Sequence, residues 1–232
     1  MDQVCRDLEI QPKMAKYLIK LKDFEIVIVC DDSGSMTTEF SHSRHTRWDE
    51  LRSIVKKILR ISVIFDKNGV DIYFLNREGF SRVKNPRDID REFECLPTGF
   101  TPLVRVLTEV FNSALARTGR DKKLLVFVAT DGEPTDDRGN PNVPELERLM
   151  NEIRNIETTY VTFLLCTDDP ASVRYLNSWD RNMIHVDVVR DFLSEREEIR
   201  HRQGMNFPFS QGDYIVKALV GAIDPDIDSL NE

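Results

Sequence analysis

The chain has 232 residues, of which 41% are hydrophobic and 31% are charged, and its formal net charge at neutral pH is −8. These values are typical of a soluble globular protein, and the length suits one large α/β domain or two small ones. The negative charge argues against nonspecific nucleic-acid binding and against adhesion to anionic lipid, and no apolar run approaches the ~20 residues that span a bilayer.

Strand-like and helix-like segments alternate along the chain. Taken in order, an amphipathic segment at 14–21 precedes a strand at 26–30, a helix at 48–59, a strand at 70–75 and a less regular stretch at 79–95 with room for a short edge strand. After these come a helix at 103–115, a strand at 124–129, a helix at 144–153, a strand at 160–166, a helix at 173–179, a strand at 184–189 and a helix at 214–222. The helices show apolar residues at helical spacing, and three of the strands are almost entirely apolar, as in a parallel sheet covered on both faces.

This alternation predicts an α/β fold with a doubly wound, mostly parallel sheet of about six strands and helices on both faces. Because no linker, repeat or low-complexity segment interrupts it, we expect a single domain over residues 1–232. Its core should lie at about 23–189, with an N-terminal helix and C-terminal helical segments packed on it.

Cysteine usage and the N-terminus bear on location. The four cysteines are far apart and form no CxxC pair: Cys5, Cys30, Cys95 and Cys166. Cys30 and Cys166 end apolar runs and look like small buried hydrophobic residues. This usage of cysteine fits a reducing compartment. The first residues show no basic segment followed by an apolar one, so no secretory signal is expected. We therefore expect a cytoplasmic protein.

Five oxygen-bearing residues follow the predicted strand ends or precede a helix. Asp31, Ser33 and Ser35 come directly after the first strand, and the glycine between the serines lets the chain curl into a tight loop. Asp131 follows the strand at 124–129, and Thr101 stands just before the helix at 103–115.

The expected sheet would bring these residues together. In the common strand order 3-2-1-4-5-6, ligands bind where the winding reverses, between the first and fourth strands. If the segment after Gly79 holds the third strand, Asp31 and Asp131 flank that crevice on strands only ~4.8 Å apart. Two carboxylates so close would repel unless a cation or proton lay between them, and an all-oxygen set suits Mg²⁺ or Mn²⁺.

The three-part pattern resembles the metal-ion-dependent adhesion site of von Willebrand factor A domains. D-x-S-x-S follows the first strand, the threonine lies in G-x-T-x-L, T-D-G follows the later strand, and the resemblance spans about residues 23–189. It implies that Ser33, Ser35 and Thr101 are hydroxyl ligands of one divalent cation, Mg²⁺ or Mn²⁺ rather than Ca²⁺. It implies that Asp31 and Asp131 bind the ion directly or through water. A Glu or Asp carboxylate of a partner protein would fill the vacant position, so the chain is expected to be a binding module and not an enzyme.

Two other functions are compatible with the same residues. One is a Mg²⁺-dependent phosphoryl-transfer hydrolase with Asp31 as nucleophile. Against it, the third position of the motif is Ser33 rather than Asp, and no His, Lys or Cys stands near the motifs as acid or base. The other is an intracellular scaffold subunit in which the metal is purely structural. The roles of Asp32 and Glu133, and the oligomeric state, stay open at this stage.

Overall fold

Six β-strands form one sheet in this computed structural model, which describes residues 1–41, 43–113 and 122–231. The strands are β1 (Phe24–Cys30), β2 (Val70–Phe74), β3 (Phe80–Val83), β4 (Lys123–Thr130), β5 (Thr159–Leu165) and β6 (Val186–Val189). Their order in the sheet is β3-β2-β1-β4-β5-β6, and all neighbours run parallel except β2 and β3. The expected α/β class and the mostly parallel six-stranded sheet are confirmed, and β3 is the short edge strand expected within 79–95.

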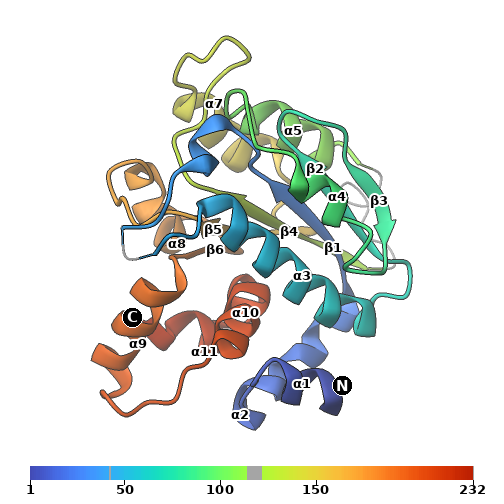
Figure 1. Ribbon diagram of the computed structural model, residues 1–232, viewed down its shortest axis with the longest axis vertical. Coiled ribbons are helices and arrows are strands. Elements are labelled where there is room, and N and C mark those ends of the chain that lie inside the picture. The colour runs from blue at the N-terminus through green and yellow to red at the C-terminus, as the bar shows by residue number, and fades with distance from the viewer. Residues whose placement is uncertain (42, 114–121, 232) are drawn as a thin grey trace.

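Helices surround this sheet (Figure 1). The α-helices are α1 (Asp2–Asp7), α2 (Pro12–Ala15), α3 (Arg47–Phe65), α4 (Asp90–Glu94), α5 (Leu103–Phe111), α7 (Val143–Arg148), α8 (Trp179–Asn182), α9 (Phe192–Gln203), α10 (Gln211–Val220) and α11 (Pro225–Asp228). Shorter 3-10 segments are η1 (Lys16–Asp23), η2 (Gly34–Thr37), η4 (Arg174–Ser178), η5 (Gly221–Ile223) and η6 (Ser229–Asn231), and η3 (Leu149–Ile153) is a π-helical continuation of α7. None of the described helices is both long and apolar enough to cross a membrane.

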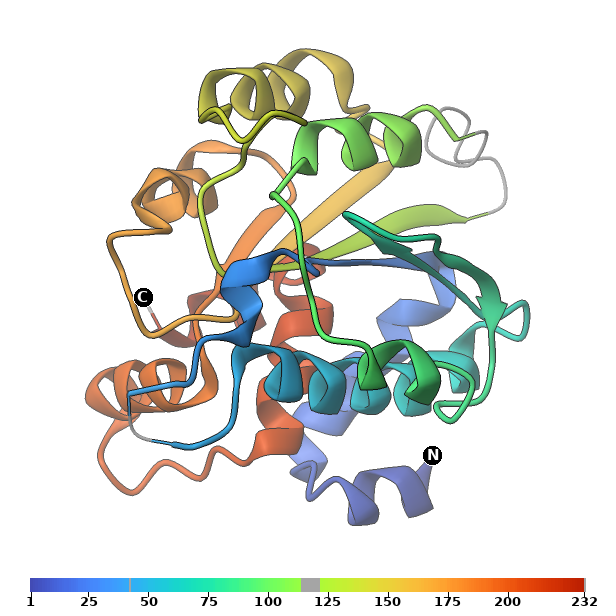
Figure 2. The ribbon, with the colours of Figure 1, turned by 45° about the horizontal axis from the view of Figure 1, so that its top comes forward.

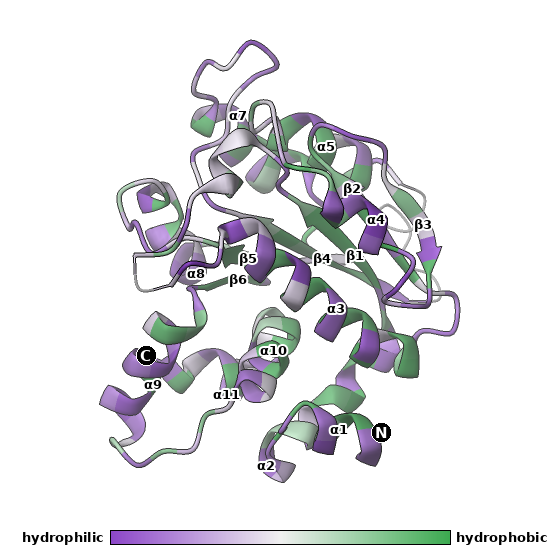
Figure 3. Ribbon diagram, in the orientation of Figure 1, coloured by the Kyte–Doolittle hydropathy of each residue, from purple (hydrophilic) through white to green (hydrophobic). Residues whose placement is uncertain are grey.

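Side chains of β1 alternate between two hydrophobic clusters. Ile26 and Ile28 belong to a cluster that also contains residues of α3 and α10, whereas Val27 and Val29 belong to one that contains residues of α5, α7 and α8. Figure 2 shows α3 and α5 on opposite sides of the strands, and Figure 3 shows that the strands are mostly hydrophobic while the loops and many helical turns are hydrophilic. The near-continuous apolar character of β1, β4 and β5 therefore reflects burial on both sides.

The last strand begins later than the sequence suggests. The expected strand at 184–189 starts at Val186, because His185 has a φ of 55°, a left-handed conformation that is incompatible with a continuing strand. The ring of His185 stacks on Tyr160 with centroids 3.9 Å apart, and its Nδ1 lies 2.8 Å from the Ile156 carbonyl oxygen. The end of the helix expected at 103–115 falls in part outside the described residues, since Leu115 is not among them.

The N-terminal segment, residues 1–23, packs against α10. The Gln11 amide donates to Asp213 Oδ1 at 2.8 Å, and the Ser210 hydroxyl donates to the Glu9 carbonyl at 2.7 Å. Ser210 and Asp213 also form the capping box that begins α10. A Cβ at Gly212 would lie 2.0 Å from the Leu8 carbonyl oxygen, so this close approach requires glycine.

Candidate functional site

Asp31 and Asp131 lie side by side after the ends of adjacent strands. Cys30 of β1 pairs with Ala129 of β4 in parallel register, and the Asp31 amide donates to the Ala129 carbonyl at 2.9 Å. Both aspartates are almost completely buried. The register of the two strands therefore fixes the two carboxylates side by side at the carboxyl ends of β1 and β4.

The loop after β1 joins these carboxylates through its two serines. The Ser33 amide donates to Asp31 Oδ1 at 2.9 Å, the hydroxyl oxygens of Ser33 and Ser35 are 3.0 Å apart, and the Ser35 hydroxyl donates to Asp131 Oδ1 at 2.8 Å. The 3-10 turn η2 curls the loop enough for both serines to face the same side. Four of the five residues singled out in the sequence thus form one continuous hydrogen-bonded chain.

Backbone hydrogen bonds hold Thr101 beside the same strand ends. The Gly34 amide of the serine loop donates to the Gly99 carbonyl at 3.1 Å, which joins the two loops. The Thr101 amide donates to Thr135 Oγ1 at 2.9 Å, and the Thr135 amide donates back to the Thr101 carbonyl at 2.9 Å. Gly99 has a φ of 99°, a conformation that favours glycine. These bonds hold the three loops that carry the five residues against one another.

The five residues, Asp31, Ser33, Ser35, Thr101 and Asp131, are called the strand-end site below. Burial raises the pKa of Asp31, and the nearby charge of Asp131 raises it further, to about 7, although hydrogen bonds from Ser33 and from Thr130 oppose the shift. The two carboxylates are therefore close enough to repel. A proton or a cation between them would relieve that repulsion, and carboxylate and hydroxyl oxygens are the donors that a hard divalent cation prefers.

Two residues that the sequence analysis did not single out complete the surroundings of these carboxylates. The Thr130 hydroxyl donates to Asp31 Oδ2 at 2.6 Å, and Arg47 Nη1 donates to Asp131 Oδ2 at 2.7 Å. Arg47 is the first residue of α3, and its side chain is only 11% exposed. Thr130 belongs to the T-D-G motif and was within reach of sequence reasoning, whereas Arg47 carries no signal other than its place at a helix N-terminus.

Asp32, whose role was open, points away from the strand-end site. Its Oδ1 accepts from the Asn76 amide at 2.7 Å, and its Oδ2 accepts from Arg77 Nε at 2.7 Å. Arg77 also donates to the Glu92 carbonyl at 3.0 Å, so it ties Asp32 to the segment beyond β3. Asp32 thus has a full set of partners of its own, and Glu133 is exposed to solvent beside the site.

A pocket of about 350 Å³ opens near the end of β5. Its lining comes from the loop before α3, from α3 itself, from the end of β5 and from the starts of α9 and α10, and includes Phe40, His45, Cys166, Phe192 and Tyr214. Within the described part of the chain, the lining contains none of the five strand-end residues. The pocket is a neighbour of the strand-end site and not part of it.

Comparisons with known proteins add little to this geometry. No protein-family model and no curated protein matches the chain. Among solved structures, it is similar to the crystal structure of the pilus adhesin SpaC from Lactobacillus rhamnosus GG, at 16% sequence identity and a TM-score of 0.47. The match covers 84% of this chain and 31% of that chain, so this chain spans about a third of the adhesin's length. A likeness at this level supports no conclusion about function.

Proposed function

We propose that this chain is a metal-dependent protein-binding module with a doubly wound sheet of the von Willebrand factor A type. In this proposal the strand-end site holds one divalent cation, Mg²⁺ or Mn²⁺. A Glu or Asp carboxylate of a partner protein completes the coordination shell, so that the ion bridges the two proteins.

The observation that carries the proposal is the convergence of two carboxylates and two hydroxyls where the strand order reverses. From β1 the chain continues to β2 on one side, and from β4 it continues to β5 on the other, so the reversal lies between β1 and β4. Open α/β sheets bind ligands at this point. The hydrogen bonds that join Asp31, Ser33, Ser35 and Asp131 hold four oxygen-bearing side chains at that reversal.

The donor set fits a hard ion with an open position. Two carboxylates neutralise a divalent cation, while neutral hydroxyls leave it enough Lewis acidity to attract a further carboxylate. Mg²⁺ keeps several waters in most protein sites, and a partner's carboxylate can replace one of them. The serine hydroxyls are free to rotate, so they can turn lone pairs toward an ion without a change in the backbone.

Arg47 supports an indirect role for Asp131. One oxygen of Asp131 accepts from Ser35 and the other accepts from Arg47, so both oxygens are already engaged. This arrangement favours contact with a metal-bound water over direct ligation of the ion. Both oxygens of Asp31 also accept hydrogen bonds, but from the Ser33 amide and the Thr130 hydroxyl. Because none of the described residues donates to Asp31 from a charged group, Asp31 is the stronger candidate for direct contact.

Binding of Mn²⁺ to chelator-treated protein, followed by water-proton relaxation, tests the proposal. We expect about one bound Mn²⁺ with at least one exchanging water, and we expect a glutamate-containing peptide to displace that water. Asp31→Asn and Thr101→Ala should abolish or strongly weaken binding. Asp137→Asn is the matched control, because Asp137 follows the same strand but pairs with Arg105 in an exposed ion pair.

Each failure has a distinct meaning. Absence of Mn²⁺ binding with the peptide present would reject the metal site. Bound Mn²⁺ without an exchanging water would favour the scaffold function, in which the metal is structural. Partner binding that persists in excess chelator would reject the ion as a bridge.

A further inference from the structure

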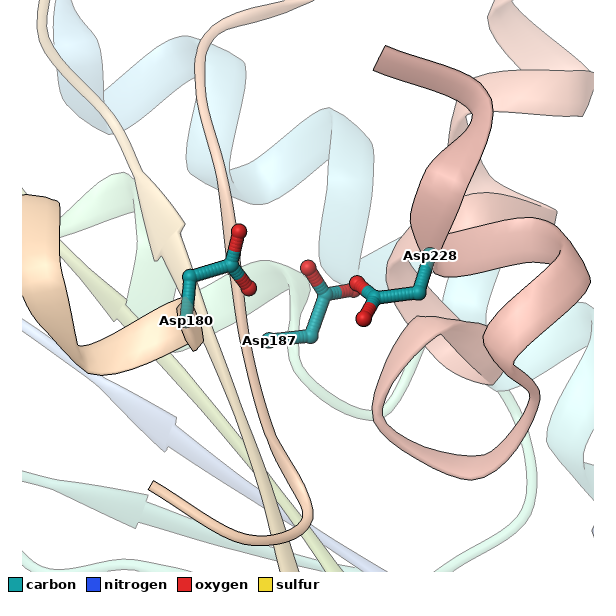
Figure 4. A group of neighbouring side chains, drawn as sticks. All are labelled: Asp180, Asp187 and Asp228. Atoms are coloured by element: carbon teal, nitrogen blue, oxygen red, sulfur yellow. The ribbon is translucent and has the colours of Figure 1, made fainter. Parts of the chain in front are cut away.

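Three carboxylates from separate elements meet at the outer edge of the sheet. Asp180 lies in α8, Asp187 in β6 and Asp228 at the end of α11, and one oxygen from each lies within 4.8 Å of the others. Figure 4 shows the three side chains pointing toward a common region. β6 is the last strand of the sheet, so this edge cluster lies far from the reversal between β1 and β4.

Asp187 occupies an unusual position in the edge cluster. It has no exposed surface, and within the described residues neither of its carboxylate oxygens accepts a hydrogen bond. A Cβ at Gly221 would lie 1.7 Å from Asp187 Oδ2, so only glycine allows the carboxylate to sit against this turn. Burial of a carboxylate without hydrogen-bond donors costs free energy, and a nearby cation lowers that cost.

The ammonium of Lys217 compensates the charge of Asp187 only in part. Its ammonium is completely buried and lies 3.8 Å from Asp187 Oδ1 and 3.5 Å from Glu195 Oε1. The first distance is too long for a hydrogen bond, and Lys217 Nζ has no hydrogen-bond partner among the described residues. One ammonium thus serves two buried carboxylates, and the carboxylates of Asp180 and Asp228 lie beside Asp187.

The other two carboxylates leave the edge cluster accessible. Asp180 Oδ1 accepts from the Val188 amide at 3.2 Å, which places it at the edge of β6. Asp228 ends α11, a helix whose start is capped by Asp224. Both side chains are partly exposed, so an ion could enter from solvent while Asp187 holds it from within.

We propose that Asp180, Asp187 and Asp228 form a divalent-cation site suited to Ca²⁺, which fastens α8 and α11 to the edge strand. Ca²⁺ takes six to eight oxygen ligands in a flexible shell, whereas Mg²⁺ demands near-ideal octahedral geometry and is usually held by only one or two carboxylates, so three carboxylates from separate elements favour Ca²⁺. Waters would complete the shell around the ion. Lys217 remains the partner of Glu195.

Ca²⁺ titration into chelator-treated Asp31→Asn protein tests this site without a contribution from the strand-end site. We expect one Ca²⁺ with a Kd on the order of 10⁻⁵ to 10⁻⁴ M, as in sites of moderate charge. Asp228→Asn and Asp180→Asn should each weaken binding about tenfold or more, and both positions are exposed enough for the variants to fold. Asp226→Asn, an exposed aspartate in the same helix, should bind Ca²⁺ as before.

Terbium, which replaces Ca²⁺ and emits when a nearby tryptophan is excited, locates the ion. Trp179 directly precedes Asp180 in α8, so bound Tb³⁺ should emit, and Trp179→Phe should remove the emission while Ca²⁺ binding persists. The proposal is overturned if the Asp31→Asn protein binds neither ion, or if Asp228→Asn and Asp180→Asn both bind as tightly as their parent.

Discussion

The strand-end site and the edge cluster both crowd carboxylates around one basic side chain, but they satisfy them differently. In the strand-end site, Asp31 and Asp131 accept hydrogen bonds from a backbone amide, two hydroxyls and the guanidinium of Arg47. In the edge cluster, Asp187 accepts no hydrogen bond from any described residue, and its cation, Lys217, is 3.8 Å away.

This difference predicts how stability changes when the basic side chain of each site is removed. A carboxylate held by several donors can tolerate the loss of one of them, because the others still stabilise its charge. A carboxylate that depends on one distant ammonium cannot. Removal of the basic residue should therefore be severe in the edge cluster and mild in the strand-end site, and the predictions below test that contrast.

The largest effect is expected from Lys217→Met. Loss of the buried ammonium leaves Asp187 and Glu195 without a counter-charge and should lower the free energy of unfolding by about 3–5 kcal/mol. Urea unfolding in the presence of chelator measures the change. Lys20→Met is the control: Lys20 pairs with Asp224 but is exposed to solvent, so its loss should change the free energy of unfolding far less. Equal losses in the two variants would show that Asp187 and Glu195 do not depend on the ammonium of Lys217.

Asp31→Asn should raise stability in chelator and lower the affinity for Mg²⁺. In chelator, the variant should be more stable than the parent by about 1–2 kcal/mol, since it removes a buried charge that Asp131 repels. Its affinity for Mg²⁺ should fall by about a hundredfold or more, equivalent to roughly 2.7 kcal/mol. Thermal unfolding with and without Mg²⁺, together with calorimetric titration, gives both numbers. A variant that is destabilised in chelator would show that the carboxylate is held by its donors without strain.

The pH dependence follows from the pKa of Asp31, which burial and Asp131 raise from 3.8 to about 7. Between those two values the native protein keeps a proton that the unfolded chain has lost, so the contribution of Asp31 to stability is present at low pH. It declines as pH rises toward about 7, by up to ~1.4 kcal/mol per pH unit. Mg²⁺ competes with the same proton, so its affinity should rise up to about tenfold per pH unit below 7 and level off above it.

Urea midpoints across this range, with and without Mg²⁺, measure both trends. Asp31→Asn is the control, because it lacks the titrating carboxyl and should show a flatter profile. An equally steep profile in Asp31→Asn would assign the pH dependence to another group, such as the carboxyl of Asp187, whose pKa is also raised by burial.

The smallest effect is expected from Arg47→Gln. The guanidinium and the cation compete for Asp131, so the variant should bind Mg²⁺ about fivefold more tightly, a gain of roughly 1 kcal/mol. Calorimetry compares it with Arg44→Gln, an exposed arginine in the loop before α3 whose replacement should leave Mg²⁺ affinity unchanged. Weaker binding in Arg47→Gln would mean that the guanidinium holds Asp131 in position for the ion.

Much of the fold could be predicted from local pattern. Apolar runs indicate β1, β2, β4, β5 and β6 to within a few residues, and the runs of β1, β4 and β5 are nearly continuous because these strands are buried on both sides. The edge strand β3 has no such run, and the sequence places it only within the stretch 79–95. The start of β6 could not be predicted, because it depends on the left-handed backbone of His185, which is stabilised by its stacking on Tyr160.

The strand-end site and the edge cluster also differ in how far they could be predicted from the sequence. The five strand-end residues lie in three short motifs, so spacing along the chain indicated them and the structure brings four of them into one hydrogen-bonded chain. Arg47 reaches Asp131 from the first turn of α3, a contact that only the packed helix creates. Asp180, Asp187 and Asp228 come from three elements with no common motif, and only the folded chain brings their carboxylates together.

The contact between residues 1–23 and α10 has a consequence for synthesis on the ribosome. The Gln11 amide donates a hydrogen bond to the carboxylate of Asp213, which lies 202 residues further along the chain. At a translation rate of about 5–20 residues per second, the N-terminal segment waits roughly 10–40 s before α10 is made. During that time its apolar residues Leu18 and Leu21, which are fully buried in the finished protein, lack the helix that later covers them. The N-terminal segment therefore completes its packing only after α10 has been synthesised.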